Sequence, residues 1–247
     1  MADCLRIDAA SKHFGGLKAV DQVSFTIQEG ALAALIGPNG AGKTTLFNLI
    51  AGAMPLTSGT ITCYGKTVRE PRNACRMGIA RTFQNVRLFH ELTVLENVMV
   101  GMSGAGFLAA SLRWPGQVQA ERLRMKRAYY LLERVGLEDL SAARAGEIPF
   151  GQQRLLEIAR ALALEPKLLL LDEPAAGLNR TETGALATLI RRIHQGNITI
   201  LLVEHDMNLV MRLVEQVIVL DGGKKIAEGT PDAVRNNAAV CAAYLGG

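Results

Sequence analysis

Apolar residues gather along the chain in short runs that predict β-strands. These runs are rich in β-branched and aliphatic residues and span 23–27, 31–36, 168–171, 198–203 and 217–220. Several of them are apolar at consecutive positions instead of alternate ones, which is typical of strands covered on both faces of a parallel sheet. The pattern therefore predicts a parallel sheet with helices packed against both of its sides.

Helical periodicity follows several of these runs. Residues 43–51, 181–194 and 207–214 are expected to form helices. The region 89–165 has helical patterning and no strand-like run, which indicates an inserted helical lobe. Within it, residues 101–116 are rich in Gly, Ser and Ala and predict no single structure.

The pattern divides the chain into two parts. Residues 1–88 and 166–247 are expected to form one core, and residues 89–165 a helical subdomain inserted into it. A length of 247 residues suffices for a core with such a lobe. The composition is that of a globular protein, because 49% of residues are hydrophobic and 20% are charged.

Charge and cysteine content limit the partners and the compartment. The net charge of +4 is a modest excess, and an aromatic content of 5% argues against a surface that stacks bases, so no nucleic-acid partner is expected. The four cysteines lie far apart, which favours reduced thiols in a cytoplasm. The first residues lack the apolar stretch of a secretory signal, and residues 98–112 are too short to span a bilayer. We therefore expect a cytoplasmic protein that reaches a membrane only through a partner.

The segment GPNGAGKT at 37–44 matches the phosphate-loop pattern GxxxxGK[ST], placed after one predicted strand and before a predicted helix. Glycines let successive backbone N–H groups point at phosphate oxygens, and the helix directs its positive end at the same place. Lysine then reaches the β- and γ-phosphates, and a hydroxyl next to it suits Mg²⁺. The residues expected to bind ATP here are Gly37, Pro38, Asn39, Gly40, Ala41, Gly42, Lys43, Thr44 and Thr45.

Two acids follow the aliphatic run 168–171. Strand ends are often acidic only because they are solvated, but beside a phosphate loop the pair favours catalysis. We expect Asp172 to hold Mg²⁺, directly or through water, and Glu173 to act as the general base that orients the attacking water. His205 follows the run 198–203, and we expect it to contact the γ-phosphate because parallel strands bind ligands beyond their carboxyl ends.

Five ordered motifs make the chain resemble ABC-type ATP-binding subunits. They are GPNGAGKTT, RTFQNVRLF, PFGQQRLLEIARAL, LLLLDEPAAGLN and LLVEHD. The resemblance implies a P-loop NTPase fold of RecA-like α/β type, with a mainly parallel sheet core, an N-terminal antiparallel β segment and an inserted α-helical subdomain. It implies that Gln84 senses the γ-phosphate and Mg²⁺, that Phe14 stacks on the adenine, and that the turn 176–179 communicates across a dimer. For Phe14, simple burial in the core is the alternative.

The segment 148–152, which we call the signature segment, departs from the usual LSGGQ of the family. It reads IPFGQ, so the usual serine hydroxyl and first glycine are absent, and Pro149 has no N–H to donate. Gly151, Gln152 and the following helix N-terminus are then left to contact the γ-phosphate of the opposite subunit. Pro149 suits the first turn of a helix.

The resemblance extends over nearly the whole chain and is strongest to the ATPase subunits of bacterial branched-chain amino-acid importers, which tend to lack the same serine. It implies a head-to-tail dimer with an identical or homologous ATP-binding subunit, transmembrane permeases, and indirectly a periplasmic solute-binding protein. The protein would then lie on the inner face of the membrane. The surface of residues 84–89, with Asn85, Val86 and Leu88, is expected to receive a permease helix.

Other functions remain open from the sequence. An importer of urea or other amides and a lipopolysaccharide exporter would use a similar ATPase, because this subunit does not touch the cargo. A soluble DNA-repair or ribosome-associated ABC ATPase would need coiled-coil arms or two ATPase halves, and neither is present in the sequence. A binding module without hydrolysis is disfavoured by Glu173 and His205.

Overall fold

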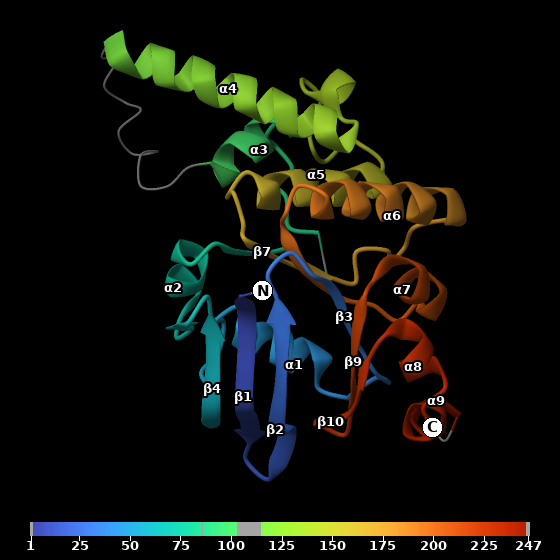
Figure 1. The fold of residues 1–247 in the computed structure, drawn as a ribbon. Coiled ribbons are helices and arrows are strands. Elements are labelled where there is room, and N and C mark those ends of the chain that lie inside the picture. The colour runs from blue at the N-terminus through green and yellow to red at the C-terminus, as the bar shows by residue number, and fades with distance from the viewer. Residues whose placement is uncertain (1, 85, 103–114, 246–247) are drawn as a thin grey trace.

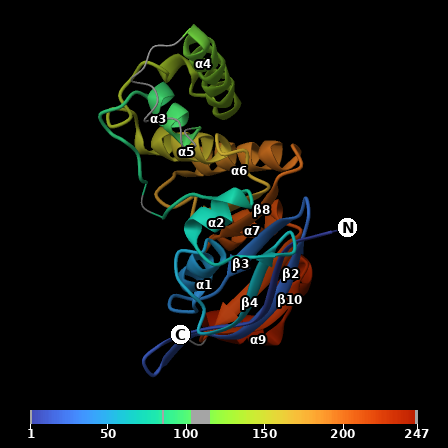
Figure 2. The same ribbon diagram turned by 90° about the vertical axis from the view of Figure 1, so that its left-hand side faces the viewer.

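The computed structural model describes residues 2–84, 86–102 and 115–245. Most of the segment 101–116, and Asn85, lie outside the described residues. Figure 1 shows two sheets below a group of helices, and Figure 2 shows the same separation from the side.

The strands are β1 (Asp3–Phe14), β2 (Leu17–Gln28), β3 (Leu32–Ile36), β4 (Ser58–Cys63), β5 (Lys66–Thr67), β6 (Ile79–Arg81), β7 (Leu168–Asp172), β8 (Thr199–Val203), β9 (Gln216–Asp221) and β10 (Lys224–Gly229). The helices are α1 (Lys43–Ile50), α2 (Pro71–Arg76), α3 (Val94–Gly101), α4 (Pro115–Val135), the short η2 (Glu138–Leu140), α5 (Phe150–Leu162), α6 (Arg180–His194), α7 (Met207–Leu213), α8 (Pro231–Arg235) and α9 (Ala238–Leu245).

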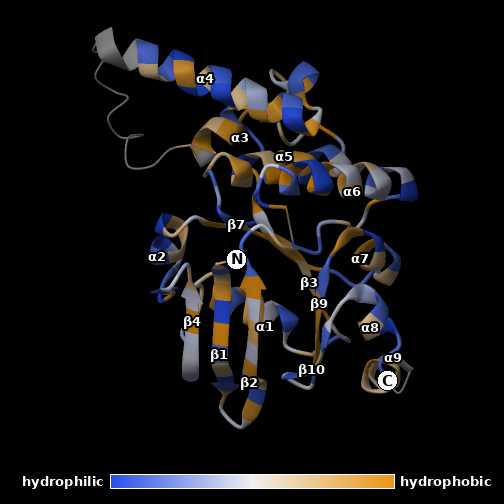
Figure 3. Cartoon of the chain, in the orientation of Figure 1, coloured by the Kyte–Doolittle hydropathy of each residue, from blue (hydrophilic) through white to orange (hydrophobic). Residues whose placement is uncertain are grey.

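The larger sheet has six strands in the order β10-β9-β3-β8-β7-β6. All its pairings are parallel except that of the edge strand β10 with β9. Along β7, Leu169 and Leu171 pack into the core shared with the helices α3 to α7, whereas Leu168 and Leu170 pack into the core shared with α1 and the smaller sheet. The prediction that the consecutively apolar strands are covered on both faces is confirmed. Figure 3 shows these strands as the most hydrophobic part of the chain.

The smaller sheet is antiparallel, in the order β2-β1-β4-β5. The N-terminal antiparallel segment that the resemblance implied is therefore confirmed. The apolar pattern alone missed β1, because one face of this strand is exposed and carries polar residues such as Arg6 and Asp8 among its buried ones. The same mixed pattern hides β4 and β10, whose positions are mostly exposed or half-buried.

The helices α3, α4 and α5 pack against one another above the larger sheet (Figure 1). Thr93 starts α3 with a capping box, in which its hydroxyl accepts the Glu96 N–H at 3.1 Å and its own N–H donates to the Glu96 carboxylate at 2.7 Å. The bonds that the Glu96 carboxylate accepts from the Thr93 N–H and hydroxyl lower the pKa of Glu96. Leu88 is 9% exposed and packs in this core, so its expected place on a binding surface is wrong. Among the described residues, no helix has both the length and the apolar character needed to cross a membrane.

Candidate active site

The phosphate loop at 37–44 joins the end of β3 to the start of α1, as the sequence predicts. Its shape depends on glycine at two positions, Gly37 with φ 152° and Gly42 with φ 98°. A Cβ atom on Gly37 would lie 2.1 Å from the carbonyl oxygen of Leu220, and one on Gly42 would lie 2.3 Å from that of Ala19. The backbones of β9 and β2 therefore press against the loop, and only glycine fits there.

Lys43 turns its ammonium group onto this loop. Its Nζ donates to the carbonyl oxygens of Gly37 at 2.7 Å and Pro38 at 2.9 Å, and the residue is 8% exposed. Burial lowers the pKa of Lys43, and the carboxylate of Glu173 acts in the opposite direction. The negative charge of Glu173 thus acts on Lys43, although the two residues are far apart in the sequence. Both residues therefore belong to one site.

The other loop residues surround this lysine. Asn39 and Gly40 are exposed at the turn, whereas Ala41 is buried. Thr44 is exposed and Thr45 half-buried in the first turn of α1, whose first backbone bond runs from Leu46 N–H to the Gly42 carbonyl at 2.9 Å. The free N–H groups of this turn belong to a helix N-terminus that begins at the loop, which is an arrangement that attracts anions.

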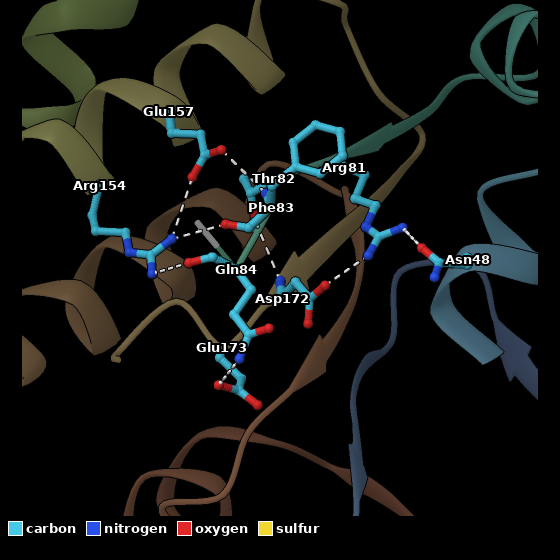
Figure 4. A network of polar contacts seen from close by, with 9 residues as sticks. All are labelled: Asn48, Arg81, Thr82, Phe83, Gln84, Arg154, Glu157, Asp172 and Glu173. Carbon is cyan, nitrogen blue, oxygen red and sulfur yellow. Dashed lines mark hydrogen bonds and ion pairs between the residues drawn. The ribbon is translucent and has the colours of Figure 1, made fainter. Parts of the chain in front are cut away.

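Asp172 ends β7 and is 2% exposed. Its Oδ2 is bound by Arg81 Nη2 at 2.7 Å, while Arg81 Nη1 donates to Asn48 on α1 at 2.5 Å (Figure 4). The guanidinium lies over the ring of Phe47 on α1 and over that of Phe83, two residues after the end of β6. Arg81 therefore ties the carboxylate of β7 to the helix that follows the phosphate loop.

Glu173, half-buried, comes next in the chain and accepts a hydrogen bond from Gln84. The bond from Gln84 Nε2 to Glu173 Oε2 is 2.9 Å long (Figure 4). The backbone of Glu173 is left-handed with φ 45°, and its N–H donates to the Val203 carbonyl at 3.0 Å. Non-glycine residues take this conformation infrequently, because their side chain is strained there.

The chain matches proteins of one well-defined family. The family described as ABC transporter matches residues 20–176, and that described as branched-chain amino acid ATP-binding cassette transporter matches residues 224–247. The chain is 42% identical to the high-affinity branched-chain amino acid transport ATP-binding protein BraF of Pseudomonas aeruginosa, over 98% of this chain and 97% of that protein. The corresponding LivG protein of Salmonella typhimurium is 44% identical over the same shares. The chain belongs to the ATP-binding proteins of ABC transporters. Within that family, it falls in the group of branched-chain amino acid ATP-binding proteins.

Solved structures agree with this assignment. The ABC ATPase has a TM-score of 0.86 to the ADP conformation of the ATP-binding cassette MJ1267, with 31% identity and full coverage of both chains. It has a TM-score of 0.77 to a dimeric post-hydrolysis state of the cassette MJ0796 bound to ADP and Pi, with 25% identity over 92% of this chain and 98% of that one. The expected P-loop NTPase fold and the expected ATPase activity are thereby confirmed.

The signature segment of this ABC ATPase lies against the turn 176–179. A Cβ atom on Gly177 would lie 2.9 Å from the Phe150 ring, and one on Gly151 would lie 2.7 Å from the Glu182 carboxylate at the start of α6. Gln152 Oε1 is buried and accepts no hydrogen bond from the described part of the chain. Pro149 stands at the N-cap of α5, one residue before the first turn that we predicted for it, because its ψ of 150° is extended.

His205 follows β8 at the same edge of the sheet, with its side chain 64% exposed. The residue before it, Glu204, was not predicted and is 1% exposed. The Glu204 carboxylate accepts the Ala175 N–H at 2.9 Å and the His205 N–H at 3.2 Å, and burial raises its pKa. Glu204 thus links the backbone of Ala175, two residues after Glu173, to the backbone of His205.

Phe14 is 49% exposed at the end of β1, where it pairs with Leu17 in a hairpin. Burial in the core, the alternative for this residue, is therefore excluded. The hairpin strand β2 also carries Ala19, whose backbone lies against the phosphate loop. Lys12 Nζ lies 5.2 Å from the centre of the Phe14 ring.

Besides Glu204, sequence reasoning missed three more charged residues of this site, Arg81, Arg154 and Glu157. Arg154 and Glu157 lie on α5 and are 4% and 2% exposed. One signal was available for Glu157, since it stands between the apolar residues Leu155, Leu156 and Ile158, where a charge needs a partner. The partner, however, is a backbone N–H 74 residues away along the chain, and a sequence does not reveal that.

Proposed function

We propose that this ABC ATPase hydrolyses MgATP to power the import of branched-chain amino acids. The names of its relatives support this class of cargo. The bond between the Gln84 amide and the Glu173 carboxylate carries the proposed chemistry, because it fixes a carboxylate that can accept a proton at the residue that follows Asp172.

Nucleotide binding follows from the loop. The N–H groups of 37–45 and the Lys43 ammonium hold the β- and γ-phosphates, and Thr45 donates to the α-phosphate. For Lys43 this means exchanging its bonds to the Gly37 and Pro38 carbonyls for bonds to phosphate oxygens. The exposed ring of Phe14 stacks on the adenine.

Oxygen atoms suitable for Mg²⁺ come from Thr44, Gln84 and Asp172. Among the described residues, no three His, Cys, Asp or Glu side chains form a metal cluster. This donor set fits a cation that arrives with the phosphates of ATP better than a cation held by protein alone. Arg81 engages Asp172 through Oδ2, so Asp172 would use Oδ1 for the cation. When bound, Mg²⁺ would neutralise charge on the β- and γ-phosphates.

In the reaction, Glu173 accepts the proton of the attacking water and keeps that water oriented. Gln84 holds the Glu173 carboxylate in place. His205 contacts the γ-phosphate from the end of β8, with its backbone fixed by Glu204.

The subunit acts in a head-to-tail dimer with an identical or homologous ATPase. Gly151, Gln152 and the start of α5 face the γ-phosphate bound by the opposite subunit. The Oε1 atom of Gln152, which is buried and has no partner among the described residues, supports a contact made on assembly. Residues 89–165 form the lobe that moves on closure, and hydrolysis removes the phosphate that holds the dimer shut.

The permeases contact this lobe from the membrane, so the ATPase lies on the cytoplasmic face of the inner membrane, and a periplasmic binding protein supplies the cargo. Phe89, not Leu88, offers the apolar contact, because it is 51% exposed. We expect Phe89→Asp to lower transport while basal ATP hydrolysis stays unchanged.

The test is transport by the assembled complex in vesicles. Labelled leucine uptake that requires ATP and is lost with Glu173→Gln supports the proposal. Uptake of urea without uptake of leucine would reassign the cargo to an amide importer, and leucine uptake at the wild-type rate with Glu173→Gln would remove Glu173 from the chemistry.

A further inference from the structure

Helix α5 grips the peptide between Phe83 and Gln84 with two buried side chains of opposite charge. Arg154 Nη1 donates to the Phe83 carbonyl at 2.8 Å, and its Nη2 donates to the Gln84 carbonyl. Glu157 Oε1 accepts the Phe83 N–H at 3.1 Å. Figure 4 shows Arg154 and Glu157 reaching this segment from the same helix. We call this arrangement the α5 clamp.

Burying the two charges of the clamp disfavours the folded state. The Arg154 and Glu157 side chains are 5% and 2% exposed and stand 3.5 Å apart, and burial raises the pKa of Glu157. Arg154 Nε is buried without a partner in the described part of the chain. A buried ion pair seldom stabilises a fold more than apolar side chains of the same size would, so stability does not explain this pair.

Arg154 and Glu157 both bind the main chain of one short segment, residues 81–84. At one end of this segment Arg81 is bound to Asp172, and at the other the Gln84 amide is bound to Glu173. The clamp holds the peptide that joins them, from a helix that begins at the signature residues Phe150 and Gly151. Helix α5 is therefore connected to the proposed catalytic carboxylate through Gln84, whose carbonyl accepts from Arg154 and whose amide donates to Glu173.

We propose that Arg154 and Glu157 are positioning residues that set the distance of Gln84 from Glu173. A displacement of α5 moves the Gln84 backbone with it and so makes or breaks the amide–carboxylate bond. Closure at the signature segment thereby controls hydrolysis within the same subunit. This inference rests on the proposed role of Gln84.

A double-mutant cycle tests it, in the ATPase assembled with its permeases. kcat and KM for MgATP are measured for the wild type, Arg154→Met, Gln84→Ala and the double variant. We expect Arg154→Met to lower kcat by about 10-fold with KM within about 2-fold of the wild type, because positioning affects turnover and not binding. In the Gln84→Ala background the same change should alter kcat by less than about 2-fold, because contacting residues in one network are not additive.

Two further variants test whether the hydrogen-bond geometry of the α5 clamp matters, apart from its charges. Arg154→Lys keeps the charge but cannot reach two carbonyls with a planar fork, so it should not restore kcat. Glu157→Gln, close to the same shape, should show the same non-additivity with Gln84→Ala and keeps the test decisive if Arg154→Met does not fold. The matched control is Arg192→Met, at an exposed position of α6, which should leave kcat and KM unchanged.

Equal losses of kcat from Arg154→Met, and from Glu157→Gln, in the wild-type and Gln84→Ala backgrounds would overturn the clamp alone. Full restoration of kcat by Arg154→Lys would overturn it as well. An unchanged kcat for Gln84→Ala by itself would overturn both the clamp and the proposed role of Gln84.

Discussion

The phosphate loop and the carboxylate network at Asp172 and Glu173 are held in place by different kinds of contact. The loop is one continuous segment whose shape is fixed by backbone atoms, with Leu220 and Ala19 pressing on it from neighbouring strands. The network is built of side chains from α1, β6, α5 and β7, joined by hydrogen bonds across the chain (Figure 4). The loop is thus a rigid holder, whereas the network can change as its elements move.

The largest expected effects are those of substitutions at Glu173 and Lys43. One should affect the turnover of MgATP and the other its binding. Glu173→Gln is expected to lower kcat by about 10³-fold, or roughly 4 kcal/mol of activation free energy, with MgATP affinity retained, because a proton acceptor is lost. Lys43→Ala should instead weaken MgATP affinity by about 10-fold or more, because a charge-assisted bond to phosphate is lost. Titration calorimetry and steady-state hydrolysis measure the two quantities. Undiminished affinity of Lys43→Ala would break the comparison.

A methyl group in the loop should damage the fold itself. Gly37→Ala would place a Cβ 2.1 Å from the Leu220 carbonyl at a φ that only glycine takes readily. We expect a loss of roughly 3 kcal/mol or more in the free energy of unfolding, from overpacking and backbone strain together. Urea unfolding measures it, with Gly184→Ala as control, since a Cβ there meets no atom within 4 Å and its helix α6 favours alanine. A stability equal to that of the wild type would contradict a backbone-fixed loop.

Removing one side chain from the network should cost less. Asn48→Ala deletes the acceptor that binds Arg81 Nη1 while Asp172 keeps its own bond to the same guanidinium. We expect a loss of about 1.5–3 kcal/mol in the free energy of unfolding, the range for a hydrogen bond to a charged group. The same urea experiment tests it, and a loss as large as that of Gly37→Ala would show that the network is as rigid as the loop.

The smallest effect concerns pH. Burial raises the pKa of Glu157 above its ordinary value of 4.5, so the stabilising contribution of its protonated form is complete below pH 4.5 and is lost as pH rises through the folded pKa. Compared with Glu157→Gln, which does not titrate, the wild type should lose stability as pH rises above 4.5, by at most about 1.4 kcal/mol per pH unit. A stability difference between the two proteins that is constant from pH 4 to 8 would exclude this.

The same contrast explains what the sequence could predict. The loop, the core strands and the position of Asp172 and Glu173 at the end of a strand could be predicted because the information is local: consecutive apolar residues, glycines at fixed spacing, acids after an apolar run. Arg81, Arg154 and Glu204 were not found, because each binds an atom that is distant along the chain and, for Arg154 and Glu204, one that every residue carries on its backbone. Leu88 was misplaced because the sequence does not show which apolar residue of 84–89 faces a partner and which faces the protein's own core.

The left-handed backbone of Glu173 sets the stability of the fold against the catalytic role that we propose for its carboxylate. Glycine would adopt φ 45° without the penalty of roughly 1 kcal/mol that a side chain incurs. A library of variants sorted only for heat resistance would therefore enrich glycine at this position and discard the ATPase in doing so. At position 173, thermal stability and ATP hydrolysis therefore favour different residues.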